Sequence, residues 1–146
     1  MAAISFDDYF LTKLSYNVNP NYNPEINEID LSPTLNFGVT IFKTSNKVIT
    51  KLGVTLGNLD NPDAGFQIDI EIRGAFSFDD DKIREYDIEL ENFIKESTIS
   101  ILWSFIRPFV SDMITRGNRF PNYILPVINV VELVSDNDIE VLYEED

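Results

Sequence analysis

The residues that could carry out chemistry in this chain are carboxylates, because its 146 residues include no histidine and no cysteine. This composition removes the commonest general base and metal ligand, thiolate catalysis, disulfides and cysteine-based zinc sites. Three consecutive acids at Asp79–Asp81 do not converge easily on one ion, and no calcium-loop spacing follows them. A hydrolase that used carboxylates alone would need a deep polar pocket with a perturbed acid pair, and Glu89 and Glu91 point to different faces. We therefore expect that the protein is not an enzyme and that it has neither a metal site nor a cofactor.

The net charge limits the partners that the chain can bind. Its 25 acidic and 11 basic residues give a formal charge of −14, which repels nucleic acids and anionic membranes and attracts basic partners. Simple solubility would explain the same charge. The longest uncharged apolar run, around Ile99–Ile106, is far shorter than the about 20 residues of a membrane span, and the N-terminus lacks the pattern of a signal peptide. We expect a cytoplasmic protein without nucleic-acid partners or direct membrane insertion.

The length and the hydrophobic content of 44% predict one folded domain over residues 1–146. Residues 1–8 and 135–146 are candidates for flexible tails. The second of these is acidic, and Ile139, Val141 and Leu142 could order part of it.

Four segments alternate between apolar and polar residues, which predicts β-strands. In the first, Phe10, Thr12, Leu14, Tyr16 and Val18 are expected on one face. An Asn/Pro-rich connection follows at 19–30, and residues 44–47 form a hairpin turn. Four strands in sequence, each with one apolar face, predict an antiparallel meander that needs a cover. The four strands are expected at 10–18, 35–41, 48–56 and 66–78.

Beyond Asp79–Asp81 the apolar period becomes helical. Ile83, Tyr86, Leu90, Phe93 and Ile94 indicate a first helix. Ser97 or Thr98 is the expected N-cap of a second, long helix that bends at Pro108 and ends at Gly117. Asn129 is expected to cap a short helix that starts at Val130.

The long helix carries two apolar ribs at i, i+4 spacing, one starting at Ile101 and one at Leu102. Each rib drifts about 40° per step, so together they cover a broad sector of the helix. Burial of every one of these residues in a single core is the simpler interpretation. The alternative is that one sheet face absorbs part of the stripe and another copy of the chain covers the rest. The candidates for that oligomer interface are Trp103, Ile106, Phe109, Val110 and Met113.

After the helix, residues 118–129 hold an apolar row between two prolines. Prolines keep such a segment extended, so its apolar groups are expected to lie along a surface.

The order and spacing of these motifs resemble the family of SecB, the bacterial export chaperone. The sequence follows that family's pattern "LFPYAR…RGxFPxxxLxPxNFxxL", with one extra residue near Arg119. The segment "TKLSY" at 12–16 is similar to the family's first strand, and "GAF" at 74–76 matches the close of its fourth. The resemblance covers about residues 10–133. The matching residues of the pattern are Leu102, Arg107, Arg116, Gly117, Phe120, Pro121, Leu125, Asn129 and Leu133.

The resemblance implies an α+β fold in which a four-stranded antiparallel sheet is packed by a long helix, with shorter helices besides. It implies an ATP-independent holdase that assembles as a dimer of dimers and binds unfolded or precursor polypeptides in surface grooves. The client-groove candidates are Phe120, Tyr123, Ile124, Leu125, Val127, Phe42 and Phe78.

The sequence departs from the family where the translocase motor SecA docks. Asp69 matches one of the docking acids, whereas Lys13 and Asn17 stand where better-known members carry acids. Pro108 also replaces a usual acid, and Ser104-Phe105 replaces the Pro-Tyr pair. Delivery of clients to SecA and the Sec translocase is the expected role. A dedicated chaperone of a toxin–antitoxin system, or a SecB-fold interaction protein outside export, is the alternative.

Overall fold

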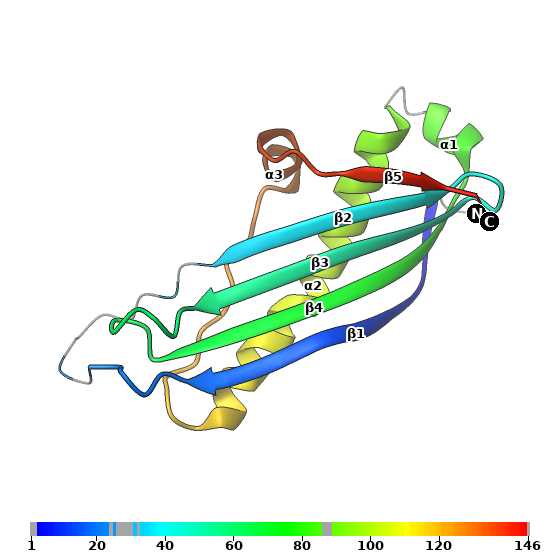
Figure 1. Ribbon diagram of the computed structural model, residues 1–146. Helices are drawn as coiled ribbons and strands as arrows, with labels where there is room; N and C mark the ends of the chain where they lie inside the picture. The colour runs from blue at the N-terminus through cyan, green and yellow to red at the C-terminus, as the bar shows by residue number, and fades with distance from the viewer. Residues whose placement is uncertain (1–2, 24, 26–30, 32, 86–88, 146) are drawn as a thin grey trace.

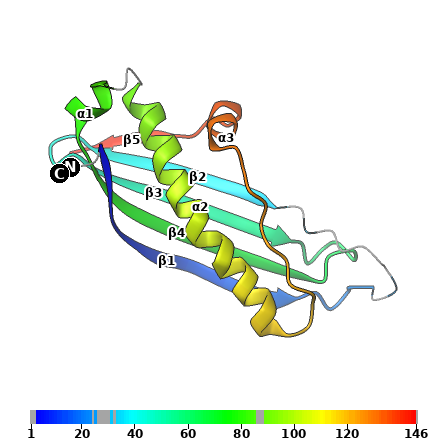
Figure 2. The same cartoon turned by 180° about the vertical axis from the view of Figure 1, so that it is seen from behind.

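The computed structural model describes residues 3–23, 25, 31, 33–85 and 89–145. One five-stranded sheet forms the first layer, and a long helix crosses one of its faces as the second (Figures 1 and 2). The strands are β1 (Ile4–Val18), β2 (Thr34–Phe42), β3 (Lys47–Gly57), β4 (Phe66–Phe78) and β5 (Val141–Glu144). The helices are α1 (Asp80–Glu85), α2 (Leu90–Gly117) and α3 (Val130–Asp136).

The sheet has the order β1-β4-β3-β2-β5 and is not the four-stranded antiparallel meander that the sequence predicted. β5 is a fifth strand and pairs parallel to β2, and β1 pairs with β4 instead of with its sequence neighbour β2. The connection after β1 is tied to the β3–β4 loop, because the Asn19 side chain donates hydrogen bonds to the carbonyls of Asn61 and Ala64, each at 2.8 Å. In the sheet, β4 and β3 therefore lie between β1 and β2.

Both termini of the described chain take part in the sheet. β1 begins at Ile4, within the first candidate tail. In the second, Ile139 is 5% exposed, and β5 pairs with Val39–Phe42 of β2. Met1, Ala2 and Asp146 lie outside the described residues.

Two β-bulges interrupt the alternation of β1, one between Phe6 and Asp8 and one between Leu11 and Lys13. Each bulge adds a residue and shifts the side-chain phase. Phe10 consequently lies opposite Arg73, on the outer face of the sheet, whereas Leu11 and Leu14 lie opposite Ile72 and Ile70 on the helix-covered face. The prediction that Phe10 and Leu14 share a face was wrong for this reason.

The long helix begins eight or nine residues, a little over two turns, earlier than predicted. Its N-cap is Glu89, and Thr98 lies inside it, fully buried. The Thr98 hydroxyl donates to the carbonyl of Ile94 at 2.7 Å and accepts from Thr50 Oγ1 at 2.8 Å, so this polar residue joins the helix to β3. Tyr86, which was assigned to the first helix, lies outside the described residues.

The ends of α2 and α3 agree with the sequence. α2 continues through Pro108 and ends at Gly117, where Asn118 takes the left-handed conformation and donates its N–H to the carbonyl of Thr115. Asn129 caps α3 and accepts the N–H of Glu132 at 3.2 Å. Within the described chain, no helix is long and apolar enough to cross a membrane.

The two ribs of α2 have different environments. Leu102, Ile106, Val110 and Ile114 are all 0% exposed and pack against the sheet as the core. Ile101, Phe105, Phe109 and Met113 are only half-buried. One face of the helix is thus absorbed by the sheet, and the neighbouring rib keeps accessible apolar surface.

Candidate apolar groove between strand β1 and helix α2

β1 is an edge strand whose helix-side residues are incompletely covered. The helix packs mainly on β4 and β3, and it reaches β1 less. Four apolar residues of β1 lie on this face, because the bulges shift the alternation, and each keeps 37–42% of its surface exposed. They are Phe6, Leu11, Leu14 and Val18. A strip of apolar surface therefore runs along β1 beside the helix.

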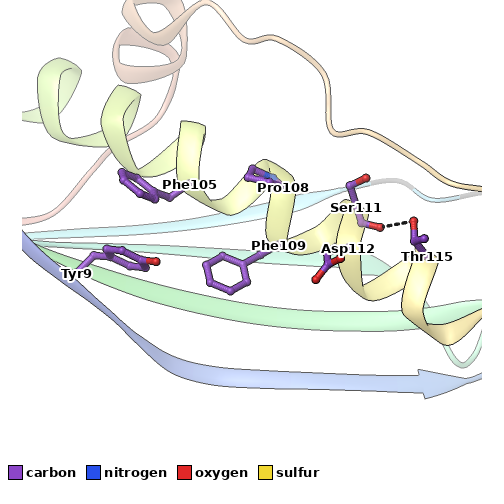
Figure 3. A pocket seen from close by; sticks show the side chains of 7 residues that line it. All are labelled: Tyr9, Phe105, Pro108, Phe109, Ser111, Asp112 and Thr115. Atoms are coloured by element: carbon purple, nitrogen blue, oxygen red, sulfur yellow. Dashed lines mark hydrogen bonds between the residues drawn. The ribbon is translucent and has the colours of Figure 1, made fainter.

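An open cavity of about 490 Å³ lies between this strand and α2, and we call it the β1–α2 groove. Figure 3 shows Tyr9 on the strand side of this space and Phe105 and Phe109 on the helix. The rings and Pro108 give the groove an apolar surface that can take apolar side chains by burying area from water. The groove is lined by Tyr9, Phe105, Pro108, Phe109, Ser111, Asp112 and Thr115.

Close contacts hold both ends of the groove. At one end, the ring centroid of Phe105 lies 4.7 Å from that of Tyr9 and 5.2 Å from that of Phe6, within the range of favourable aromatic pairs. At the other, a Cβ atom on Gly117 would lie 2.7 Å from the Tyr16 hydroxyl, so glycine permits the end of α2 to approach β1. The spacing between strand and helix is therefore set by packing at each end.

The charged group of the groove is Asp112, which forms an exposed ion pair with Arg116 one turn later at 2.8 Å. The hydrogen bond to Asp112 and the charge of its carboxylate raise the pKa of Arg116 above its usual value. Among the described residues, no cluster of carboxylates could hold a metal ion. The arrangement is suited to binding apolar side chains and offers no acid–base pair.

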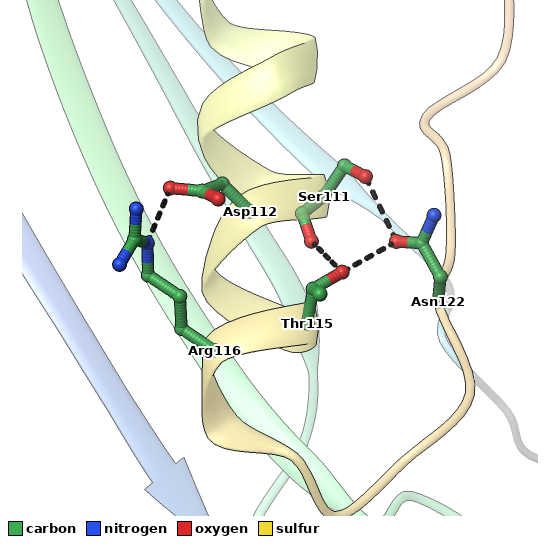
Figure 4. A network of polar contacts seen from close by, with 5 residues as sticks. All are labelled: Ser111, Asp112, Thr115, Arg116 and Asn122. Atoms are coloured by element: carbon green, nitrogen blue, oxygen red, sulfur yellow. Dashed lines mark hydrogen bonds and ion pairs between the residues drawn. The ribbon is translucent and has the colours of Figure 1, made fainter.

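A rib of hydrogen-bonding side chains on α2 anchors the segment that follows the helix. Trp103 Nε1 donates to the carbonyl of Pro126 at 3.1 Å, and Arg107 Nε donates to that of Leu125 at 2.8 Å. Further along, the hydroxyls of Ser111 and Thr115 both donate to Asn122 Oδ1 (Figure 4). Residues 103, 107, 111 and 115 are spaced by four, so this single rib holds the segment along the helix.

The predicted client residues of that segment are divided between core and surface. Leu125 is fully buried, and Tyr123 is half-buried against the core. Phe120 packs on Phe66, with 5.2 Å between the ring centroids. The Phe120 ring also lies so close to Gly65 that a Cβ atom on that glycine would be 2.3 Å from the ring. Ile124 and Val127, by contrast, are 61% and 82% exposed. Only the last two offer most of their surface to a partner.

Phe42 and Phe78 lie far from this segment. Phe78 is 6% exposed and lines a separate cavity of about 360 Å³ beside α1, and Phe42 ends β2 half-buried. Phe120 contacts Phe66 at the opposite end of β4 from Phe78, roughly 40 Å away at the rise of a β-strand. The structure therefore does not bring the seven candidates together in one groove.

The interface candidates divide in the same way. Ile106 and Val110 are fully covered by the sheet of their own chain, and Trp103 is 6% exposed, so these three offer little or no surface to a second copy. Phe109 and Met113 belong to the half-buried rib and keep accessible surface.

Asp69 lies on the outer face of the sheet, where its carboxylate accepts hydrogen bonds from Thr55 Oγ1 at 2.6 Å and Gln67 Nε2 at 2.9 Å. Partial burial acts to raise its pKa, but these hydrogen bonds, the charge of Lys13 and a further bond from Ser15 outweigh it and lower the pKa below its usual value. The carboxylate is thus ionised and already engaged within the sheet.

Sequence reasoning identified the rib that contains Phe105 and Phe109 but missed Phe6 and Tyr9 as their partners. Residues three apart cannot face the same side of a regular strand, and it is the bulge between Phe6 and Asp8 that allows it. No signal in the sequence pattern marks that bulge.

No protein-family model matches the chain, and no curated protein matches it significantly. Among solved structures, the SecB-like chaperone Rv1957 of Mycobacterium tuberculosis, in complex with a ChAD peptide from the Rv1956 HigA1 antitoxin, superposes with a TM-score of 0.53 at 17% identity, over 87% of this chain and 88% of that one. A Streptococcus agalactiae protein of unknown function gives a TM-score of 0.48 at 9% identity, over 85% and 97%. The chain therefore has a SecB-like α+β fold, with a mixed sheet and a long helix.

Proposed function

We propose that the protein is an ATP-independent holdase chaperone that binds unfolded or precursor polypeptides in the β1–α2 groove. The observation that carries this proposal is the half-buried rib of α2 beside an apolar edge strand. Tyr9, Phe105 and Phe109 line an open groove, and the exposed helix-side residues of β1 extend the apolar strip. Unfolded chains expose the apolar segments that such a surface binds.

The charge of −14 supports the same proposal. It attracts basic segments of unfolded chains, and it keeps molecules with exposed apolar grooves from associating with one another. The SecB-like fold is a further support, since it is shared with a protein named as a chaperone.

The test is to dilute a chemically unfolded substrate into the protein and to follow aggregation by light scattering, without nucleotide. We expect suppression by the unaltered chain and a clear loss with Phe109→Ser. The matched control is Val131→Ser, which alters an exposed apolar residue of α3 outside the groove. Aggregation that proceeds unchanged at several-fold excess of the unaltered protein would reject the holdase function.

The destination of the clients is a finer proposal. The export role assigns Asp69 to SecA docking, and it predicts binding of a SecA C-terminal peptide that Asp69→Lys abolishes. The alternative is a dedicated chaperone of a toxin–antitoxin system, and its support is that the SecB-like chaperone Rv1957 forms a complex with an antitoxin peptide. Absence of any SecA-peptide binding, with client holding retained, would favour this alternative.

We further propose that the chain forms a homo-oligomer, a dimer of dimers, with Met113 as the interface candidate that keeps surface outside the β1–α2 groove. Light scattering combined with size-exclusion chromatography measures the mass directly. A monomer at micromolar concentration would contradict this assembly without touching the holdase proposal.

A further inference from the structure

The second edge of the sheet, at β2, is only partly covered. β5 pairs with residues Val39–Phe42, and in the described chain no strand lies beside residues 34–38 at that edge. The N–H of Val39 donates to the carbonyl of Glu140 at 3.2 Å. Backbone groups face a given edge at every second residue, so Leu35 and Phe37 direct theirs toward the same, uncovered edge. This stretch can accept an added strand.

Two cations on the outer face of the sheet, from the two strands behind β2, line the cavity beside this open edge. Lys51 of β3 stands directly opposite Arg73 of β4, an arrangement of like charges that costs stability. Arg73 forms an ion pair with Glu71, with 3.8 Å between Nε and Oε2. Within the described residues, the Lys51 ammonium forms neither an ion pair nor a hydrogen bond. In a chain with only 11 bases, Lys51 is therefore a cation that has no partner among the described residues.

Gly38 gives Lys51 access to the edge. A Cβ atom at Gly38 would lie 3.5 Å from Lys51 Cε and 4.0 Å from its Nζ, so the lysine stem lies over the glycine of β2, the strand next to the edge. Lys51, Arg73, Phe37 and Gly38 line one cavity of about 220 Å³, together with Glu140 and Leu142 at the start of β5. Glu140 borders this cavity but does not pair with Lys51.

We propose that this site binds an extended acidic peptide segment of a partner protein, added as a strand along residues 34–38 of β2. Main-chain hydrogen bonds would form with Leu35 and Phe37, and a carboxylate on the outer side of the added strand would meet Lys51 and Arg73. The charge complementarity favours this occupant, because a neutral or basic strand would leave Lys51 unpaired. The remaining acidic surface repels the same peptide, which confines its binding to this edge.

The probe for the test is a fluorescein-labelled nonapeptide that alternates valine and glutamate, and binding is followed by fluorescence anisotropy at low salt. The comparison peptide replaces every glutamate with glutamine. We expect the glutamate peptide to bind more tightly, and Lys51→Gln to weaken its binding about fivefold, the effect of one exposed ion pair. The matched control Lys13→Gln removes a cation of β1 on the same face and leaves the affinity unchanged.

Equal affinity of the two peptides, or an unchanged affinity of Lys51→Gln, would overturn the proposal. Folding does not obscure the result, because Lys51→Gln relieves the repulsion with Arg73 and is expected to keep or raise the melting temperature. A fall in melting temperature would contradict the opposition of charges on which the proposal rests.

Amide hydrogen exchange locates the site independently. The glutamate peptide is expected to protect the amides of Leu35 and Phe37 and to leave those of β1 unaltered. Protection of β1 alone would overturn the proposal. Protection of Leu35 and Phe37 when the protein concentration is raised without peptide would also overturn it, because a second copy of the chain would then be the occupant of this edge. Phe109→Ser should retain peptide binding, so failure of the holdase proposal and failure of this one are distinguishable.

Discussion

The two edges of the sheet differ in how they are covered. In the described chain, β1 has no strand along its outer edge over all 15 residues, carries two bulges and borders the apolar β1–α2 groove. β2 is covered over Val39–Phe42 by the four residues of β5, and the uncovered remainder borders a polar site with Lys51 and Arg73. Bulges reduce the tendency of an edge strand to pair indiscriminately, and a short covering strand does the same.

The difference indicates that one sheet can offer two kinds of recognition. At β1 the side chains provide the apolar surface, and the bulges bring Phe6 and Tyr9 to the helix side. At β2 the side chains of Leu35 and Phe37 pack against the core, so the backbone and the outer cations are what a partner can contact. Changes that affect both edges, one edge, or a single hydrogen bond should therefore be separable by experiment.

The largest expected effect comes from Gly74→Val, which acts where α2 packs on the centre of the sheet, between the two edges. A Cβ there would lie 2.7 Å from Leu102 Cδ2 and 2.7 Å from the Phe76 ring. We expect overpacking to lower the free energy of unfolding by about 3 kcal/mol, as measured by urea denaturation. Gly53→Val is the control, since its Cβ would meet Asn36 at an ordinary 3.5 Å. An equal loss of stability in this variant would mean that close packing of α2 on Gly74 is not the cause of the effect.

Phe105→Ala should destabilise the β1 edge selectively. Phe105 is half-buried between Phe6 and Tyr9, and its removal is expected to cost about 2 kcal/mol, below the loss for a fully buried ring. Amide exchange should become faster in β1 and stay unchanged in β5. Uniform acceleration across both strands would contradict the separation of the two edges.

Tyr143→Phe should weaken the attachment of β5 and remove a loss of folding stability at alkaline pH. The Tyr143 hydroxyl donates to Glu91 of α2, and partial burial together with this bond raises its pKa from 10.0 to about 12. The fold thus favours the protonated phenol, whose contribution to stability is complete below pH 10 and is lost as the pH rises from about 10 to about 12.

We expect the substitution to cost at most about 1 kcal/mol at neutral pH, because the side chain is 46% exposed. The measurement is the free energy of unfolding as a function of pH. The unaltered chain should lose more stability across the alkaline window than the variant, and parallel curves would show that the hydrogen bond does not hold β5.

Tyr16→Phe should have the smallest effect, and it should be stabilising. The Tyr16 hydroxyl is buried where β1 meets the end of α2, and it lacks a hydrogen-bond partner among the described residues. Replacing it with hydrogen removes a desolvated polar group, so we expect a gain of up to about 1 kcal/mol in thermal or urea denaturation. A loss of similar size would mean that the hydroxyl is satisfied in solution.

Much of the fold followed from local patterns in the sequence. The alternation of β2, β3 and β4 and the rib spacing of α2 were correct, and so were the helix ends at Gly117 and Asn129. The start of α2 was missed because Thr98 matches the composition of an N-cap, while its hydroxyl is in fact bonded within the core to Thr50. β5 was missed because four mostly exposed residues give no strand pattern.

The sequence by itself determined that this chain has an amphipathic sheet and a helix with more apolar surface than one sheet face absorbs. Only the tertiary structure decided that the Leu102 rib is core and that the Phe105 rib lines a groove with Tyr9. It also decided that β1 lies beside β4 and that Lys51 reaches over Gly38. Side-chain periodicity is a local property of the chain, whereas strand order, bulges and the choice between two equally apolar ribs depend on contacts between residues far apart in sequence.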